Sequence, residues 1–150
     1  MTVDALRAGD RVALERSLRA TTSFTADEIA CALSMVDDDE YEWFAAREDG
    51  VPRGFLCVGE AAMAEKSFEL YWIWVDPAAR GRGVAGRLMD RFDDVCRSRA
   101  MRLATIYTSS TEPYAAARAL YERSGFRVAA RLEEFYRAGD DLIIYRKDYR

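Results

Sequence analysis

The spacing of apolar residues follows a helical period over the N-terminal part of the chain. Apolar side chains recur there every three or four positions, as in a helix that buries one face. This pattern predicts a helix over residues 12–18, capped by Asp10, and a second helix that begins at the capping box 25–28. The apolar face of the second helix is formed by Ile29, Leu33 and Val36. The acidic run 37–40 opposes the helix dipole and is predicted to form a solvated loop.

Beyond the acidic run the pattern becomes extended and then alternates with helical segments. Strands are predicted at 42–48 and 53–58, joined through the turn residues 49–52. Segment 68–75 is apolar on both faces, which predicts a central strand. Two more helices are predicted at 83–99 and 113–123, and three more strands at 102–108, 126–133 and 142–149. This element order predicts an α/β fold with a mixed sheet and helices on both of its faces.

The composition is that of one soluble globular domain. The chain has 150 residues, of which 50% are apolar and 32% charged, and it contains no linker, repeat or low-complexity stretch. A chain of this length buries enough surface to fold without disulfides or a metal. We therefore assign residues 1–150 to a single domain.

The cysteines and the apolar runs predict a cytoplasmic protein. Cys31, Cys57 and Cys96 are widely spaced and form no CxxC pair, as expected for reduced and buried thiols. Segment 1–10 is charged and has no apolar run, so no signal peptide is predicted. The longest strongly apolar run, 70–75, is far too short for a membrane span.

The chain contains no histidine, which excludes several kinds of catalytic centre. A Ser-His-Asp triad, a Cys-His pair and a His-ligated zinc site all need that side chain. Proton transfer must therefore use carboxylates, tyrosines, cysteines, lysines or water, and no metal is expected. The net charge of −4 also argues against nonspecific nucleic-acid binding.

The most informative segment lies between the strand 68–75 and the helix 83–99. An Arg/Gly loop joins them, and the free backbone N–H groups at the start of a helix attract anions. The glycines allow close approach of a phosphate, and the arginines add positive charge. The segment predicts a diphosphate site formed by Arg80, Gly81, Arg82, Gly83, Val84, Ala85, Gly86 and Arg87. An ordinary glycine-rich turn before a surface helix is the alternative.

Two other phosphate motifs fit this segment poorly. The letters of 81–86 match the dinucleotide fingerprint G-x-G-x-x-G, but residues 76–80 separate its first glycine from the end of the strand. The next strand ends in Tyr-Thr-Ser at 107–109, so it offers no acidic residue to hold a ribose. The Gly-Lys-Ser/Thr of a Walker A loop is absent.

Two motifs together resemble the GNAT superfamily of acyl-CoA N-acyltransferases. The stretch 80–85, Arg-x-x-Gly-x-Ala after a strand ending in Val-x-Pro, is similar to the acyl-CoA signature of that family. The stretch 119–126, Ala-Leu-Tyr-Glu-Arg-Ser-Gly-Phe, is similar to its motif L-Y-x-x-x-G-F. The resemblance covers about residues 55–147, and Tyr114 departs from it because the family often has asparagine there. A narrower subgroup of unknown substrate is indicated by 69–75, 108–110 and 135–141.

The resemblance implies a mixed, mostly antiparallel sheet that contains one splayed parallel pair of strands. Strands 68–75 and 102–108 would run side by side and separate at their C-terminal ends. The pantetheine arm of acetyl-CoA would insert there and pair with the backbone groups that the separation leaves open. The implied contacts on this side are the backbone of Ile73, Trp74 and Val75, together with Tyr114.

The resemblance also implies which groups carry the chemistry. Glu69 would be the general base that takes the proton of the amine, directly or through water, with burial raising its pKa. The alternative for Glu69 is a surface ion pair with Lys66. Tyr121 would protonate the departing thiolate, and its alternative is a tyrosine that only packs in the core. The N–H of Val75 would stabilise the oxyanion.

The expected activity is transfer of an acetyl group from acetyl-CoA to a primary amine of a small molecule. The acidic residues that could attract a cationic amine are 37–40, Glu112, Asp140 and Asp141. The alternative for each of them is a solvated loop or turn. A protein lysine or N-terminus is an alternative acceptor, and a CoA-binding sensor without catalysis is an alternative of another class. No nucleic-acid or membrane partner is expected, and a homodimer is left open.

Overall fold

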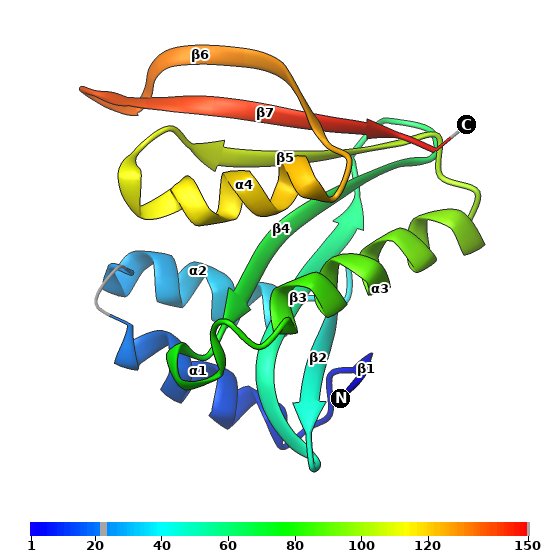
Figure 1. Ribbon diagram of the computed structural model, residues 1–150, viewed down its shortest axis with the longest axis vertical. Helices are drawn as coiled ribbons and strands as arrows, with labels where there is room; N and C mark the ends of the chain where they lie inside the picture. Colours follow the sequence, from blue (N-terminus) through cyan, green and yellow to red (C-terminus); the bar gives the residue numbers. More distant parts are fainter. Residues whose placement is uncertain (22–23, 150) are drawn as a thin grey trace. The chain divides into compact units, whose positions relative to one another are not determined.

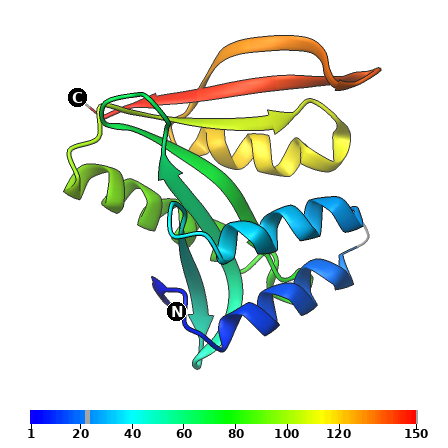
Figure 2. The same ribbon diagram turned by 180° about the vertical axis from the view of Figure 1, so that it is seen from behind.

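The structure is a computed structural model that describes residues 1–21 and 24–149 (Figures 1 and 2). Its helices are α1 (Asp10–Ala20), α2 (Ala26–Val36), α3 (Val84–Ser98) and α4 (Ala115–Arg123), with the 3-10 turns η1 (Pro77–Ala79) and η2 (Glu112–Tyr114). Its strands are β1 (Thr2–Ala5), β2 (Glu42–Glu48), β3 (Val51–Glu60), β4 (Ser67–Val75), β5 (Leu103–Ser109), β6 (Arg127–Arg137) and β7 (Asp140–Asp148). The strands form a mixed sheet in the order β1-β2-β3-β4-β5-β7-β6, which confirms the predicted fold class.

The chain divides into two compact units, which are described separately. Unit 1 comprises Met1–Gly59 and Trp72–Phe92, and unit 2 comprises Glu60–Tyr71 and Asp93–Arg150. Both β4 and α3 contribute residues to each unit. The assignment of residues 1–150 to a single domain stays a prediction.

In unit 1, strand β2 has a helix on each of its faces. The indole N–H of Trp43 donates to the carbonyl of Met35 at 3.2 Å, which places α2 against one face. The next residue, Phe44, packs against the guanidinium of Arg91 from α3, 4.9 Å from the ring centre. Successive side chains of a strand point to opposite faces, so α2 and α3 lie on opposite sides of β2, as Figures 1 and 2 show.

The start of α3 lies very close to the backbone of β3 at Gly54. A Cβ atom on this residue would stand 2.8 Å from Val84 Cγ1, 3.1 Å from Leu88 Cδ1 and 3.0 Å from the carbonyl oxygen of Trp74. These distances are shorter than ordinary van der Waals contact, so the missing side chain lets α3 and the end of β4 approach β3. Gly54 thereby fixes the position of the first turn of α3.

Strand β1 is an element that the hydrophobic pattern did not predict, so the predicted element order lacks one strand. Its four residues pair with β2 in antiparallel register. An ion pair anchors this strand, because Arg47 Nε donates to the Asp4 carboxylate at 2.7 Å. The guanidinium of Arg47 is buried and also donates to Asp10 at 2.8 Å. The strand is therefore held by charge rather than by alternating apolar residues.

The predicted cap of the first helix is wrong, whereas the cap of the second is confirmed. Helix α1 begins at Asp10 and has Gly9 at its N-cap. The Asp10 carboxylate accepts from the Arg7 N–H at 2.7 Å, and Arg47 holds the pKa of this carboxyl below its ordinary value. At α2, the hydroxyl of Thr25 accepts from the Glu28 N–H at 3.2 Å, as the capping box requires.

In unit 2, the start of β4 pairs with β5 in parallel, and β7 then pairs with β5 and β6 in antiparallel register. The parallel ladder joins residues 67–70 to residues 103–106, which confirms the predicted parallel pair. Strand β6 is exposed along its whole length and runs on to Arg137, beyond its predicted end at 133. The predicted helix 113–123 begins as the 3-10 turn η2. Within residues 1–21 and 24–149, no helix has the length and apolar character that a membrane span requires.

One face of β7 packs against both helical segments of unit 2. Tyr145 and Lys147 are two residues apart on β7, so their side chains share a face. The ring of Tyr145 contacts Tyr121 of α4 edge-on, with ring centres 5.7 Å apart. Lys147 Nζ donates to Asp93 of α3 at 2.6 Å and to the carbonyl of Ser124, just beyond α4, at 2.8 Å. These contacts hold α4 and the end of α3 on the same side of the strand.

Replacement of Gly54 by alanine tests the close packing of α3 on β3. We expect Gly54→Ala to lower the free energy of unfolding by about 1–3 kcal/mol, because the new methyl group must displace α3 or the β4 backbone. Urea unfolding followed by circular dichroism measures the change. Gly86→Ala is the matched control, since Gly86 lies in the same helix with open space around its Cβ position and alanine there favours the helix. Unchanged or higher stability of Gly54→Ala would contradict the packing.

Candidate active site

Two hydrogen bonds fix the path of the loop that follows β4 in unit 1. The Asp76 N–H donates to the carbonyl of Arg53 at 2.8 Å, and the Asp76 carboxylate accepts from the Ala78 N–H at 3.0 Å. The second bond caps η1, whose first residue is Pro77. The chain then passes through the Arg/Gly segment 80–83 into the first turn of α3.

The glycines of that segment leave open space at the start of α3. Gly81 and Gly83 have φ values of 76° and 80°, in the left-handed region that strains a residue with a side chain. A Cβ atom on Gly81, Gly83 or Gly86 would meet nothing within 4 Å. The Arg87 N–H donates to the carbonyl of Gly83 at 3.1 Å, so the N–H groups of 84–86 precede the first helical hydrogen bond. The backbone therefore presents donors to an anion at this point.

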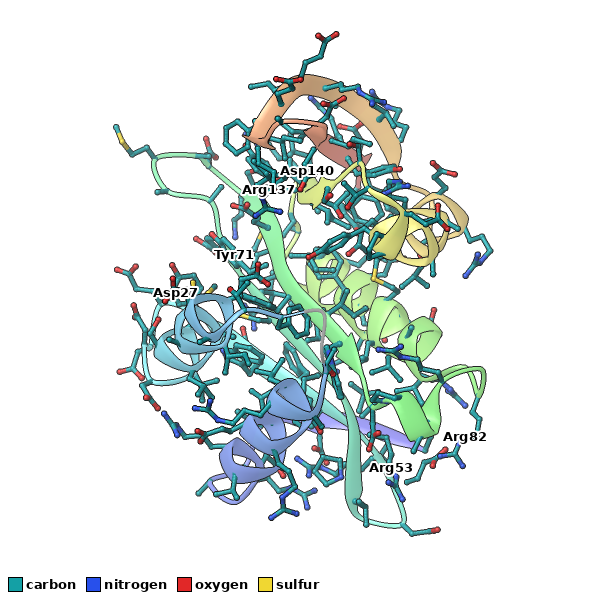
Figure 3. The ribbon with its side chains drawn as sticks, turned by 90° about the vertical axis from the view of Figure 1, so that its left-hand side faces the viewer. Asp27, Arg53, Tyr71, Arg82, Arg137 and Asp140 are labelled. Atoms are coloured by element: carbon teal, nitrogen blue, oxygen red, sulfur yellow. The ribbon has the colours of Figure 1, made fainter. Side chains whose placement is uncertain are left out.

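Arginines surround this backbone, and Glu48 of β2 holds two of them. Arg82 Nη2 lies 2.9 Å from the Glu48 carboxylate, and Arg53 Nε lies 3.8 Å from it. Arg53 Nη1 also lies 3.8 Å from the Asp76 carboxylate. Figure 3 labels Arg53 and Arg82 at this end of unit 1. The remaining predicted arginines, Arg80 and Arg87, are exposed. Unit 1 thus brings the predicted diphosphate residues together in one place.

Arg53 and Glu48 are candidate functional residues that the sequence pattern missed. The Nε atom of Arg53 is buried and has no hydrogen-bond partner in the part of the chain that the structure describes, and the Glu48 carboxylate lies 3.8 Å from it. Both residues flank the predicted hairpin turn 49–52, and that was the only sequence signal. The turn motif does not predict which loop packs against this hairpin, because that contact depends on tertiary packing.

The end of β4 carries the backbone that the family resemblance assigns to the pantetheine arm. Ile73 and Val75 are partly buried, and Trp74 is buried with its carbonyl against Gly54. The indole N–H of Trp74 is buried, and no hydrogen-bond partner for it is found among residues 1–21 and 24–149. The coenzyme contacts of these residues, and the oxyanion role of the Val75 N–H, stay predictions.

Glu69 of β4 is half-buried in unit 2. Burial raises the pKa of its carboxyl above the ordinary value, and a hydrogen bond from Tyr71 opposes part of that rise. Lys66, the partner in the alternative interpretation, instead donates from Nζ to the carbonyl of Arg99 at 3.2 Å. The environment of Glu69 is therefore that of a partly desolvated carboxylate rather than of a lysine ion pair.

Tyr121 of α4 is buried, with 5% of its surface exposed. No hydrogen bond to its hydroxyl is found in the described part of the chain, although its ring packs against Tyr145. Burial raises the pKa of the phenol well above 10, and the nearby Tyr114 and Tyr145 add to the rise. The phenol is therefore protonated at neutral pH and is a weaker acid than an exposed tyrosine.

The end of α4 explains why its motif needs a glycine. Gly125 has a φ of 90°, and the Phe126 N–H donates to the carbonyl of Tyr121 at 3.0 Å, which ends the helix. A Cβ atom on Gly125 would stand 3.3 Å from the side chain of Lys147. Tyr114 immediately precedes α4 and lies about two helical turns before Tyr121. Its predicted coenzyme contact stays a prediction.

The acidic groups considered for binding a cationic amine are mostly paired with arginines. Asp140 lies 3.1 Å from Arg137, and Asp141 lies 2.6 Å from Arg131. In the acidic run 37–40, Asp37 lies 2.9 Å from Arg11. Glu112 is exposed in η2. No group of three His, Cys, Asp or Glu side chains that could hold a metal is found within residues 1–21 and 24–149.

Comparison with known sequences places most of the chain in one family. The profile of the Acetyltransferase (GNAT) family matches residues 11–126. The mycothiol acetyltransferase of Beutenbergia cavernae is 45% identical over 62 residues, which are 41% of this chain and 20% of that protein. This chain thus spans only about a fifth of the length of that relative.

Comparison with solved structures agrees over nearly the whole chain. A GNAT-family protein from Desulfovibrio desulfuricans is 33% identical, with a TM-score of 0.92 and coverage of 98% of both chains. The ribosomal-protein-S18-alanine N-acetyltransferase of Escherichia coli is 23% identical, with a TM-score of 0.81 over 98% of this chain and 92% of that one. An aminoglycoside 6′-N-acetyltransferase complexed with coenzyme A is 15% identical, with a TM-score of 0.80 over 99% and 97%. The last two likenesses show the fold alone. The chain belongs to the GNAT acetyltransferase family.

Proposed function

We propose that the protein is an acetyl-CoA-dependent N-acetyltransferase that acts on a primary amine of a small molecule. One observation carries this proposal: Tyr121 is buried on α4, while its hydroxyl is bonded to no protein group in the described part of the chain and is not among the fully enclosed atoms that lack a partner. A hydroxyl that no protein group engages and that is not fully enclosed is able to donate to a bound ligand, which favours a role in a reaction. Membership of the GNAT family supports acetyl transfer as the class of that reaction.

The loop and helix start of unit 1 fit the diphosphate of acetyl-CoA. The space around Gly81, Gly83 and Gly86 admits a phosphate close to the backbone, and Arg82 and Arg53 bring positive charge to it. Acetyl-CoA supplies the activated acetyl group as a thioester. Glu48 balances part of the arginine charge, so the pair Glu48–Arg82 holds that side chain in place until a phosphate competes for it.

Two side chains of unit 2 divide the proton transfers. Glu69 takes a proton from the ammonium group of the acceptor, directly or through a water molecule, which frees the nitrogen lone pair. The nitrogen–carbon bond forms and the carbon–sulfur bond of the thioester breaks. Tyr121 donates its phenolic proton to the departing sulfur. The second proton of the attacking nitrogen passes through water to the Tyr121 phenolate, which leaves a neutral amide. Release of the proton of Glu69 to solvent restores the carboxylate.

Binding and turnover together test this function. Calorimetric titration with acetyl-CoA measures binding, and a thiol-release assay over a panel of small amines, lysine peptides and peptide N-termini measures transfer. Thiol release with small amines supports the proposal, and release with peptides alone supports a protein acceptor. Binding without release under any condition supports a sensor, and absence of binding overturns the coenzyme assignment.

Alanine at Gly83 tests the diphosphate site. We expect Gly83→Ala to weaken coenzyme A binding about tenfold, because its methyl group enters the open space and its left-handed φ strains the loop. Calorimetric titration measures the dissociation constant. Gly50→Ala in the β2–β3 turn is the control, since Gly50 also has a left-handed φ of 79° and an open Cβ position. An equal loss of affinity in both variants would assign the effect to general strain.

Removal of the phenolic hydroxyl tests Tyr121 as the proton donor. We expect Tyr121→Phe to lower kcat about 100-fold, as is typical for loss of an acid catalyst, and to leave the KM for acetyl-CoA nearly unchanged. Steady-state thiol-release kinetics measure both constants. Tyr145→Phe is the matched control, because it removes the hydroxyl of the neighbouring ring, which donates to Glu122 at 3.0 Å. A change in kcat of less than about twofold in Tyr121→Phe would remove this residue from the mechanism.

The pH dependence of turnover tests Glu69 as the base. The carboxylate must be ionised to accept a proton, so kcat/KM rises with pH as the Glu69 carboxyl loses its proton. Because burial raises this pKa, we expect the acidic limb above the ordinary pKa of a glutamic acid. A pH profile of kcat/KM locates the limb, and Glu69→Gln is expected to abolish it. An unchanged profile in Glu69→Gln would leave proton removal to water alone.

A further inference from the structure

The turn between β6 and β7 holds a buried carboxylate that the proposed reaction does not use. Asp140 is 5% exposed at the start of β7. One of its oxygens accepts from the Ser109 hydroxyl at 2.5 Å, and the other accepts from Arg137 Nη1 at 3.1 Å. A buried carboxylate with two such partners is a fixed point to which the arginine is attached.

The loop after β5 keeps that fixed point rigid. The Ser109 hydroxyl is bonded to the Thr111 hydroxyl at 2.8 Å and accepts from the Thr111 N–H at 3.1 Å. Arg118 of α4 donates to the carbonyls of Ser109 and Thr111 at 2.8 and 2.9 Å. Asp140 therefore joins the end of β5 to the start of β7, and α4 braces the same loop.

Arg137 is attached to this frame at one nitrogen and otherwise faces water. Its side chain is 70% exposed, in contrast to the buried Asp140. The outer edge of the guanidinium therefore presents N–H donors in a planar fork, a geometry that matches a carboxylate. Figure 3 labels Arg137 and Asp140 next to each other, with Tyr71 of the same unit below them in that view.

Phenol groups link this arginine to the proposed catalytic tyrosine within unit 2. Tyr136 precedes Arg137, and Asp140, Tyr114 and Tyr107 lie near enough to it to add to the rise in its pKa that burial causes. Tyr114 in turn lies near enough to Tyr121 to raise the pKa of that phenol. Arg118, one turn before Tyr121 on α4, donates to the carbonyls of Ser109 and Thr111, so the loop that holds Asp140 and Arg137 is bonded to the helix of the proposed proton donor.

The charge at this end of unit 2 favours an anionic group on the acceptor. Asp140 and Asp141 are engaged by Arg137 and Arg131, so they do not offer a free carboxylate to an ammonium group. The exposed fork of Arg137 is a cation, and the adjacent Tyr136 of β6 and Tyr107 of β5 are exposed as well. We propose that Arg137 is a specificity-determining residue that binds a carboxylate of the acceptor, so that the substrate is a small amine that also carries a carboxylate, such as an amino acid. This inference rests on the proposed function and names its substrate class.

Matched pairs of amines test the proposal. The pairs lysine and cadaverine, ornithine and putrescine, and tyrosine and tyramine differ only in one carboxylate. We expect kcat/KM to be higher for the carboxylated member of the productive pair. Arg137→Gln is expected to lower that value about 10- to 100-fold, as for loss of charge-assisted hydrogen bonds, and to change the value for the decarboxylated member less than twofold. Arg137→Lys, which keeps the charge without the fork, is expected to restore part of the loss.

Arg131→Gln is the matched control, because Arg131 lies on the same strand and also pairs with an aspartate. An equal loss in Arg131→Gln, or no preference for carboxylated amines in the wild type, overturns the proposal while leaving acetyl transfer intact. Absence of thiol release with every amine in the panel overturns the proposed small-molecule function and this inference with it. Both arginines are exposed, so far-UV circular dichroism is expected to match the wild type in all variants.

Discussion

The close approach of α3 to β3 at Gly54 is the constraint on which the architecture of unit 1 depends. A helix can start beside the backbone of a strand only where a side chain is missing, and Val84, Leu88 and the carbonyl of Trp74 all occupy the space that a Cβ would need. The same packing sets where the first turn of α3 points its N–H groups. The anion site is thus a consequence of one glycine in a strand, together with the left-handed glycines that follow Arg80.

In unit 2 the proposed catalytic group is a buried side chain, Tyr121, rather than exposed backbone at the start of a helix. Lys147 ties the end of α4 to Asp93 through the carbonyl of Ser124, and Tyr145 packs its ring against Tyr121. These contacts orient the phenol, and no protein group among the described residues bonds to its hydroxyl. The hydroxyl is not among the fully enclosed atoms that lack a partner, so it stays able to donate to a bound substrate.

The sequence predicted those parts of the fold that rest on local pattern. Apolar periodicity located the helices and all strands except β1, and the Thr25 cap followed from one hydroxyl and its spacing. Strand β1 was not predicted because it is held by an ion pair between its Asp4 and Arg47, which no pattern of apolar residues indicates. Arg53 and Glu48 were not predicted for a related reason. Their position beside the Arg/Gly loop depends on tertiary packing, and no local sequence motif indicates it. The hydrogen bond between Ser109 of β5 and Asp140 of β7 could not be predicted from the sequence either, because the two residues lie on separate strands.

In the absence of histidine, burial is what changes the proton affinity of the two proposed catalytic side chains. Desolvation raises the pKa of a carboxyl and of a phenol alike, but the two shifts have opposite effects on the proposed proton transfers. At Glu69 a raised pKa makes the ionised form a stronger base, which brings it closer to the basicity of an amine. At Tyr121 a raised pKa makes the phenol a weaker acid, so proton donation requires that the thiolate beside it be desolvated as well, which raises the basicity of the sulfur in the same way. Arg137, by contrast, is exposed to solvent. Its guanidinium therefore avoids the cost of desolvation until a carboxylate of the acceptor binds to it.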